Sequence, residues 1–328
     1  MTVLPWLQSH WQHLCEYSNQ NRVPQALLIS GNKGLGKLKL ATQYAAALLC
    51  TNPQQNGLAC DHCKSCLLFS AHSHPDFISL QPEEPGKTIT IGQIRQLISR
   101  LTLKPQFENY RVIIINPAEL MNNAAANAFL KYLEEPTART VIILITDKPT
   151  GLLATIVSRC QKIAINQPDR AIVNIWLKQQ TLQEETSLLL NLAQGSPLLA
   201  LQYANENMLK LRNECFETWI NISQQRIHPV IVAENWLKLS QAPLLTWMTT
   251  WVIDLIKCRF PIKADALYNP DKKDRLLALV EKIEPKGLYE LYDLLLMRQK
   301  LLDTTINKQC LFEEILITWS DLNLIKKI

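Results

Sequence analysis

Residues 31–38, with the sequence GNKGLGKL, nearly match the phosphate-binding pattern G-x-x-x-x-G-K-[ST]. Gly31, Gly36 and Lys37 fill their positions in this pattern, but Leu38 replaces the final Ser or Thr. In a working loop the backbone N–H groups and the Lys hold the phosphates of a nucleotide, and the final hydroxyl ligates Mg²⁺. Leu38 cannot ligate a metal ion. The motif therefore predicts a loop with the shape of a phosphate site, in which ATP binds weakly or not at all.

A second departure follows the apolar run at residues 111–115. A hydrolytic site needs an acid here to hold Mg²⁺, and then a Glu to activate water. Asn116 has the shape of an acid but lacks the charge on which metal affinity depends. Pro117 stands where the Glu would be, and Glu119 is expected to point elsewhere. These losses argue against nucleotide hydrolysis by this chain.

Four of the nine cysteines form a closely spaced array, C-x9-C-x2-C-x2-C, made up of Cys50, Cys60, Cys63 and Cys66. The other five are scattered singly, as expected in a reducing compartment. Four thiolates at this spacing fit a closed tetrahedral Zn²⁺ site, which would be structural because no coordination position stays open. The alternative is a set of unligated thiols or a disulfide. The nearby His62, His72 and His74 are expected to be loop residues and not ligands.

The elements that position these residues alternate between strand-like and helix-like segments in the front half of the chain. Apolar runs at residues 25–30, 111–116 and 140–146 suit buried parallel strands. Residues 37–49 read as a helix after the phosphate loop, and residues 91–101 place their apolar side chains on one helical face. Alternation of this kind predicts an α/β domain with a parallel sheet.

The back half is expected to be all-helical. Apolar residues at helical spacing form two stripes, which are Leu244, Met248, Trp251 and Leu255, and then Leu288, Leu291 and Leu295. Six of the eight Trp residues lie beyond residue 170 and are expected to pack in a core. Residues 166–170 read as a linker, and a second boundary is expected near residue 207.

Composition sets the broad class. A chain of 328 residues with 47% hydrophobic and 19% charged residues can form two or three domains with sizeable cores. The net charge of +5 permits contact with nucleic acid but does not argue for it. The N-terminus lacks a secretion signal, and no run of 18 apolar residues exists to span a membrane. We therefore expect a cytoplasmic protein with no membrane partner.

Two segments carry a specific resemblance: LMNNAAANAFLKYLEEPTARTVIILIT at residues 120–146 and LLATIVSRC at residues 152–160. They resemble the AAA+ subunits of bacterial clamp loaders, in which a helix of this form precedes a strand and then Ser-Arg-Cys. The segment NRVPQALLISG at residues 21–31 resembles the family's entry into its first core strand. The resemblance runs over about residues 5–200.

The resemblance implies a fold in three parts. Residues 1–165 would form an AAA+ nucleotide-binding-like α/β domain, a parallel sheet with flanking helices that carries a zinc-binding insertion at about residues 50–66. Residues 166–207 would form a small helical lid domain, and residues 208–328 an all-α collar domain for oligomerisation. The implied partners are other clamp-loader subunits in a hetero-oligomeric ring, the sliding clamp, and primed DNA reached through the complex.

Within that family some subunits hydrolyse ATP and others do not. Hydrolysing subunits place an Arg where this chain has Leu198, and Thr146 matches the family's polar first sensor. The resemblance therefore implies a non-hydrolysing subunit of the bacterial replicative polymerase holoenzyme, without ATPase or polymerase activity of its own. Arg159, in Ser158-Arg159-Cys160, would act as an arginine finger on the nucleotide of a neighbouring subunit during ATP-dependent clamp loading in DNA replication.

Two other functions remain open from the sequence. The chain could be an ATP-hydrolysing clamp-loader subunit with an atypical phosphate loop, because the backbone cradle and Lys37 are retained. It could also be a nucleic-acid-binding protein with a zinc module, unrelated to replication. Against the latter, the basic excess is small and the aromatic residues lie mostly in the helical half.

Overall fold

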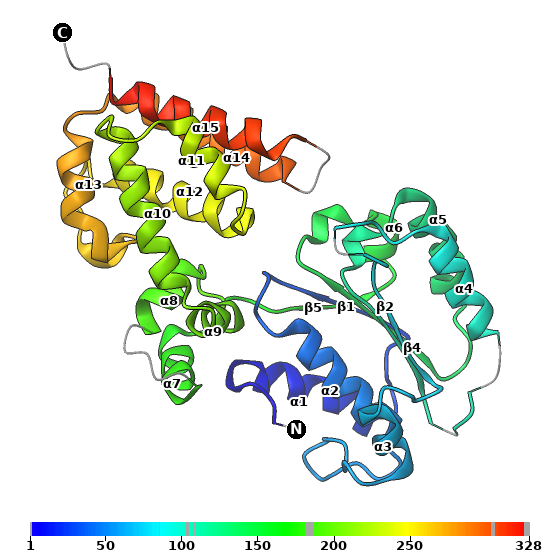
Figure 1. The fold of residues 1–328 in the computed structure, drawn as a ribbon. Coiled ribbons are helices and arrows are strands. Elements are labelled where there is room, and N and C mark those ends of the chain that lie inside the picture. Colours follow the sequence, from blue (N-terminus) through cyan, green and yellow to red (C-terminus); the bar gives the residue numbers. More distant parts are fainter. Residues whose placement is uncertain are drawn as a thin grey trace. The chain divides into compact units, whose positions relative to one another are not determined.

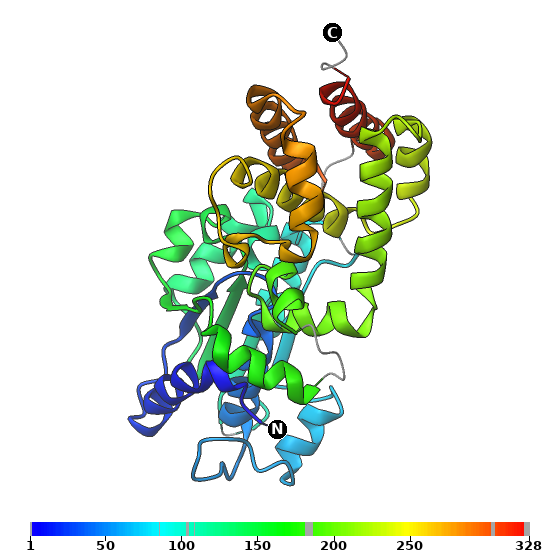
Figure 2. The ribbon, with the colours of Figure 1, turned by 90° about the vertical axis from the view of Figure 1, so that its left-hand side faces the viewer.

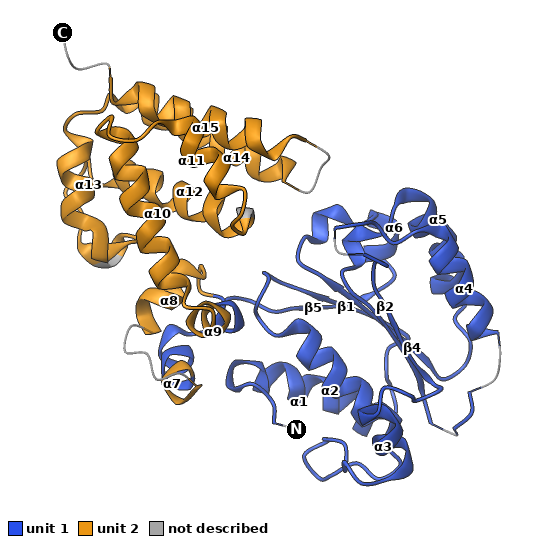
Figure 3. Ribbon diagram, viewed as in Figure 1, with its two compact units in different colours: residues 1–176, 196–199 blue, residues 177–195, 200–328 orange. Residues whose placement is uncertain are grey.

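The computed structural model describes residues 2–84, 86–102, 105–107, 109–180, 186–302 and 306–324. The chain forms two compact units, coloured separately in Figure 3. The first consists of Met1–Trp176 and Ser196–Leu199, and the second of Leu177–Gly195 and Ala200–Ile328. The segment predicted as a lid, residues 166–207, thus contributes to both units, and residues 181–185 within it lie outside the described residues.

The first unit is built on one parallel sheet of five strands in the order β2-β3-β4-β1-β5. The strands are β1 (Ala26–Ser30), β2 (Phe77–Leu80), β3 (Arg111–Ile115), β4 (Thr140–Thr146) and β5 (Gln161–Ala164). All residues of β3 and β4 are buried, which explains why their sequences, RVIII and TVIILIT, are mostly apolar and β-branched. The predicted α/β class with a parallel sheet is confirmed.

Helices cover both faces of this sheet, with α1 and α2 on one side and α4, α5 and α6 on the other (Figure 1). The α-helices of the first unit are α1 (Gln8–Asn19), α2 (Lys37–Leu49), α3 (Lys64–Ser70), α4 (Ile91–Leu101), α5 (Asn123–Glu134) and α6 (Ala154–Val157). Three short 3-10 helices join them: η1 (Pro5–Leu7), η2 (Ala118–Leu120) and η3 (Pro149–Gly151). The sheet therefore forms the middle layer of three.

The starts of α4 and α5 follow from their capping residues. Thr90 and Gln93 form a reciprocal capping box at the start of α4. The side chain of Asn122 accepts a hydrogen bond from the N–H of Ala125 at 2.8 Å and so caps α5. The apolar faces of both helices then pack on the sheet, where Ile94 and Phe129 are fully buried.

The second unit is helical throughout its described residues. Its helices are α8 (Thr186–Leu192), α10 (Met208–Ser223), α11 (Pro229–Trp236), α12 (Gln241–Lys257), α13 (Lys273–Val280), α14 (Pro285–Leu301) and α15 (Lys308–Leu322), with 3-10 helices η4 (Ala264–Ala266) and η5 (Pro270–Lys272). Two further helices, α7 (Arg170–Gln180) and α9 (Pro197–Asn205), have residues in both units. In Figure 2, α15, drawn in red, lies beside the yellow-green helices α10 and α11.

Aromatic residues form the centre of the second unit. The rings of Trp219 and Trp319 stack at 3.8 Å between centroids, and the indole N–H of Trp319 donates to the carbonyl of Trp219 at 2.9 Å. Trp251 and Phe216 pack edge to face beside this pair. Both predicted apolar stripes are buried, with every member at most 1% exposed. Five of the six late Trp residues lie in the core, as predicted, while Trp176 is only partly buried.

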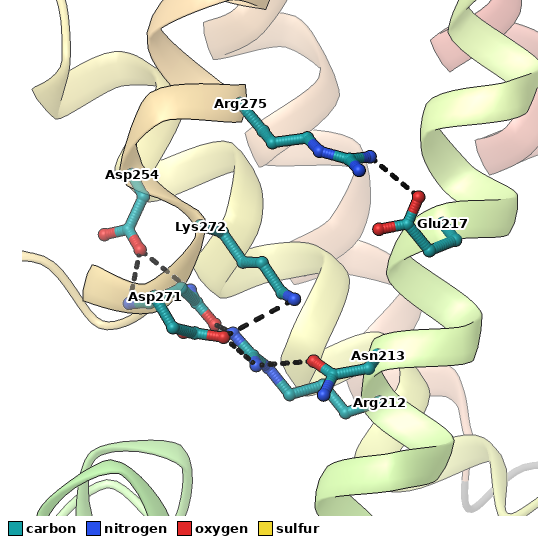
Figure 4. A network of polar contacts seen from close by, with 8 residues as sticks. Arg212, Asn213, Glu217, Asp254, Asp271, Lys272 and Arg275 are labelled. Atoms are coloured by element: carbon teal, nitrogen blue, oxygen red, sulfur yellow. Dashed lines mark hydrogen bonds and ion pairs between the residues drawn. The ribbon is translucent and has the colours of Figure 1, made fainter.

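A buried polar network joins α10 to the segment that precedes α13 (Figure 4). The guanidinium of Arg212, which is fully buried, donates to both carboxylate oxygens of Asp271 at 2.8 and 3.0 Å and to the side-chain oxygen of Asn269 at 2.6 Å. Asp254 of α12 accepts in turn from the backbone and side-chain N–H groups of Asn269. The network provides partners for both terminal nitrogens of the buried guanidinium, and so it stabilises the unit, while the Nε of Arg212 has no hydrogen-bond partner among the described residues.

Among the described residues, no helix combines the length and apolar character needed to cross a membrane.

Candidate functional site

The phosphate loop connects β1 to α2, as predicted. Gly31 and Gly36 have φ angles of +147° and +92°, which glycine adopts far more readily than other residues. A Cβ atom at Gly31 would lie 2.4 Å from the carbonyl oxygen of Ile165, so only glycine fits there. Helix α2 then begins at Lys37 without a side-chain cap, and the first N–H groups of such a helix favour anions. The backbone of a phosphate site is therefore present.

The Lys37 side chain is almost fully buried at the wall of the loop, and its ammonium is bonded to groups of its own chain. Its side chain is only 4% exposed, and its ammonium lies 2.6 Å from a carboxylate oxygen of Asp147. The ammonium also donates to the carbonyl oxygens of Gly31 at 2.6 Å and Asn32 at 2.7 Å. An ammonium has three N–H donors. All three have acceptors here, so none is left for a phosphate.

Asp147 is the residue of this site that the sequence analysis missed. It directly follows β4, and the parallel pairing of β4 with β1 brings it next to the phosphate loop. An Asp in the segment TDKP is typical of a turn, so its identity alone gave no signal. What could have identified Asp147 is its position directly after a core strand that pairs with β1.

A cavity of about 750 Å³ lies beside the loop. Its lining includes all four residues at which the sequence departs from a hydrolysing site, namely Leu38, Asn116, Pro117 and Leu198. Lys37 and Asp147 also line it, together with Lys33, Gly34, Gly36, Lys39, Thr42, Gln43 and Ile145. The fold thus brings together positions that were separate in the sequence. No carboxylate lies at the positions where Asn116 and Pro117 stand.

Thr146 and Glu119 are engaged in local contacts near this cavity. The hydroxyl of Thr146 is fully buried and accepts a hydrogen bond from the N–H of Lys148 at 3.0 Å. A carboxylate oxygen of Glu119 accepts from the N–H of Asp147 at 3.0 Å. Glu119 therefore holds the backbone of the turn after β4, which agrees with the expectation that it points away from a water-activating position.

Other segments of the first unit pack directly against the loop. A Cβ atom at Gly36 would lie 2.7 Å from the Leu4 side chain, and the indole N–H of Trp6 donates to the carbonyl of Leu35 at 2.9 Å. The carbonyl of Gly34 accepts from the N–H of Leu198 at 3.0 Å. The loop glycines therefore allow close packing of the chain on itself.

The cysteine array forms one compact cluster after α2. The sulfur atoms of Cys50, Cys60, Cys63 and Cys66 all lie within 4.8 Å of one another. The Cys50–Cys63 and Cys60–Cys66 sulfur separations are 3.9 and 3.8 Å. A tetrahedral zinc site with Zn–S distances of about 2.3 Å requires sulfurs about 3.8 Å apart. The donor set and its dimensions fit a structural Zn²⁺.

Backbone donors surround these sulfurs. The N–H groups of Cys60, Cys63 and Cys66 point at the sulfurs of Cys50, Cys60 and Cys63 at 3.3 to 3.4 Å. Burial raises the pKa of the Cys63 thiol, but hydrogen bonds from Thr51 and from the N–H of Cys66 outweigh this effect and lower the pKa to about 5. These hydrogen bonds favour the thiolate of Cys63, the form that binds metal, whereas burial raises the pKa of the Cys50 and Cys66 thiols.

The nearby histidines have other partners. His62 contacts the carbonyl of Cys60 at 2.7 Å. His74 is buried, with one ring nitrogen 2.8 Å from the Ser65 hydroxyl and the other accepting from the N–H of Asp76 at 3.1 Å. Ser65 donates to the carbonyl of Leu49, so His74 helps to fix α3, which carries Cys66, against the end of α2.

Arg159 lies in the turn between α6 and β5 and is not part of the cavity lining. Its guanidinium pairs with the carboxylate of Glu134 at 2.5 Å and donates to the carbonyl of Thr155 at 2.9 Å. The side chains of Arg159 and Glu134 are 35% and 51% exposed. Arg159 is therefore held in a surface ion pair at the C-terminal end of α5, where a second molecule can reach it.

Comparison with known proteins decides the family. A family model described as "DNA polymerase III, delta subunit" matches residues 6–169, and one described as "DNA polymerase III, delta subunit, C terminal" matches residues 206–321. The chain is 34% identical over 325 residues to DNA polymerase III subunit delta' of Pseudomonas aeruginosa, with 98% of each chain covered. This chain belongs to the delta-prime family of DNA polymerase III subunits.

Other delta-prime proteins match it over similar lengths. Identity to the Escherichia coli delta-prime subunit is 30% over 323 residues, with 97% of this chain and 95% of that protein covered. The fold resembles the crystal structure of a DNA polymerase III gamma subunit-related protein from Thermotoga maritima. That comparison has a TM-score of 0.51 at 16% identity and covers 97% and 99% of the two chains, which supports the fold alone.

Proposed function

We propose that this chain is a non-hydrolysing AAA+ subunit of a bacterial clamp loader, which supports ATP-dependent loading of the sliding clamp on primed DNA. The clamp-loader role is supported by the delta-prime relatives, which match it over nearly its full length. Its partners would then be the other clamp-loader subunits, the sliding clamp, and DNA bound through the complex. It would act in the cytoplasm, where its nine cysteines stay reduced.

The proposal that this chain does not hydrolyse ATP is supported mainly by the phosphate loop and the residues around it. Lys37 has all its donors satisfied inside the protein, and Leu38 offers no hydroxyl for Mg²⁺. Asn116 and Pro117 replace the metal-binding acid and the water-activating Glu. Phosphoryl transfer depends on positioning and on charge stabilisation by these parts, so their joint absence argues against turnover.

We assign Arg159 as an arginine finger that acts on the nucleotide of a neighbouring subunit. Such a residue must reach outside its own chain, and Arg159 is partly exposed in a turn. Its planar guanidinium can stabilise charge on a transferring phosphoryl group through paired N–H donors. The contacts with Glu134 and the Thr155 carbonyl would hold its guanidinium in place before a neighbour docks.

We further propose three functional parts: the AAA+ domain at residues 1–165, the lid at residues 166–207, and the collar at residues 208–328. The cysteine cluster would hold one structural zinc within the first part. The thiolate-favouring N–H groups and the sulfur spacing support zinc over free thiols.

Co-purification tests the proposed function. The tagged full-length chain, expressed at its native level, is recovered from a lysate of its own cells, and the bound proteins are identified by mass spectrometry. We expect the clamp-loader ATPase subunits and the polymerase to be enriched over a tag-only control. Recovery of the chain without any of them would contradict the proposal.

The cavity beside the loop favours one alternative, an ATPase of atypical type, because its volume of about 750 Å³ is in the range of ligand pockets. Steady-state hydrolysis by the isolated chain distinguishes the two. We expect no turnover above background. Turnover that scales with protein concentration and disappears in Lys37→Met would favour the alternative.

A further inference from the structure

The phosphate loop keeps most of the backbone features that bind anions. Helix α2 spans Lys37–Leu49, and its N-terminal end opens at the loop without a side-chain cap. Its free N–H groups and dipole favour a negative charge. Lys33 and Lys39 add positive charge at the cavity. The absence of a magnesium ligand at Leu38 removes catalysis, but it does not by itself prevent a phosphate from binding.

We propose that Asp147 excludes phosphate from this loop by holding the ammonium of Lys37 inside the protein and by placing its own negative charge at the cavity. This inference rests on the proposed function of the loop. It names the residue that prevents phosphate from binding there. Asp147 lies directly after β4 and is not one of the four positions that argue against hydrolysis.

The geometry gives this effect two physical components. The Asp147 carboxylate lies 2.6 Å from the ammonium, and with Gly31 and Asn32 it accounts for all three donors of Lys37. A bound phosphate would therefore have to displace a charge-assisted hydrogen bond at a side chain that is 4% exposed. The Asp147 side chain is 36% exposed and lines the cavity, so it would also repel an incoming phosphate.

The same contact stabilises the loop itself. A buried ammonium without a partner is costly, and Asp147 supplies the opposite charge. The N–H of Asp147 is fixed by Glu119, whose carboxylate accepts it at 3.0 Å. The backbone of Asp147 is therefore fixed by the Glu119 side chain. The ion pair between Asp147 and Lys37 does not depend on any ligand.

Isothermal titration of the full-length chain with inorganic pyrophosphate, without Mg²⁺, tests the proposal. Pyrophosphate matches the two phosphates that such a loop holds, and omitting Mg²⁺ removes the effect of Leu38. We expect little binding to the wild type. Asp147→Asn, which removes the charge, and Asp147→Ala, which also removes the acceptor, should raise the affinity by about tenfold or more.

Two controls isolate the role of Asp147. Glu83→Gln removes a negative charge at an exposed position of the same unit and should leave the affinity at the wild-type value. Lys37→Met combined with Asp147→Asn should abolish the gain, because the released ammonium is the expected partner of the pyrophosphate. Circular dichroism melting of each variant verifies that it is folded at the temperature of the titration.

Three results would overturn the inference. The first is that the wild type binds pyrophosphate and Lys37→Met does not, which would show that Lys37 is already available to a ligand. This comparison does not require an Asp147 variant. Equal affinities of the wild type and both Asp147 variants would contradict the inference while leaving the non-hydrolysing role intact. ATP hydrolysis by the wild-type chain would contradict both the inference and the proposed function.

Discussion

At the scale of single residues, the pattern of the phosphate loop predicted which side chains a working site would lack. Leu38, Asn116 and Leu198 were identified from motifs, and the fold brings all three to one cavity. Asp147 could not be identified in this way, because its role depends on the pairing of β4 with β1 and not on any local pattern. The partner of Arg159 was equally hidden, since Glu134 reaches it only through the packing of α5 beside α6.

The cysteine cluster gives a prediction at this scale. Wild-type protein is expected to contain one zinc per chain, and Cys63→Ser should lose most of it, because three thiolates and a hydroxyl form a weaker site. The first unit should then melt at a lower temperature. Metal analysis by mass spectrometry and a melting curve are the measurements.

Cys310→Ser is the matched control, since Cys310 is an exposed free thiol on α15 outside the cluster. It should change neither the zinc content nor the melting curve. Metal-free wild-type protein with an unaltered melting curve in Cys63→Ser would refute the structural zinc.

At the scale of elements, the segments with strong periodicity were predicted well. Helix α2 and strand β4 have the predicted bounds, and α4 spans the predicted residues 91–101. Strands β2 and β5 were not predicted; they are short strands at the two edges of the sheet. Each has only one buried residue among four, so neither shows the continuous apolar run of a central strand.

Glycine substitutions test how β1 is joined to α2. Gly31→Ala should destabilise the first unit by more than about 1 kcal/mol, because Ala is disfavoured at this φ and its Cβ would meet the Ile165 carbonyl. Gly92→Ala in α4, whose Cβ would have its nearest neighbour at 3.7 Å, should be neutral or stabilising by up to about 1 kcal/mol. Urea unfolding measures both. Equal effects would show that the loop geometry is not constrained as described.

A buried and an exposed ion pair of Figure 4 provide a comparison within the second unit. Asp271→Ala leaves the guanidinium of the buried Arg212 without its carboxylate and should destabilise the unit by about 3 kcal/mol. Arg275→Ala breaks a pair with Glu217 in which the side chains are 55% and 49% exposed. Its effect should stay within about 0.5 kcal/mol. Similar midpoints of urea unfolding for the two variants would contradict the structural role of the network.

At the scale of the whole molecule, the chain combines an α/β unit that retains the shape of a nucleotide site with a helical unit that has its own aromatic core. For catalysis, the proposed role requires that the first unit present Arg159 to a neighbour, and it does not require a working phosphate loop in this chain. This explains why the loop can lose its chemistry while its glycines remain necessary for packing. The division into three functional parts stays a prediction, and the residues predicted as a lid, 166–207, are shared between the two compact units.

The central claim is that this chain supports hydrolysis of ATP bound to a neighbouring subunit and does not hydrolyse ATP itself. It is tested most directly by the ATPase rate of reconstituted clamp-loader rings, stimulated by clamp and primed DNA, with the wild-type chain, Lys37→Met or Arg159→Ala. Gel filtration verifies that each ring has assembled. We predict that Arg159→Ala lowers the rate partially, because other sites keep their own arginines, and that Lys37→Met leaves it unchanged. An unchanged rate with Arg159→Ala and a loss with Lys37→Met would contradict the account.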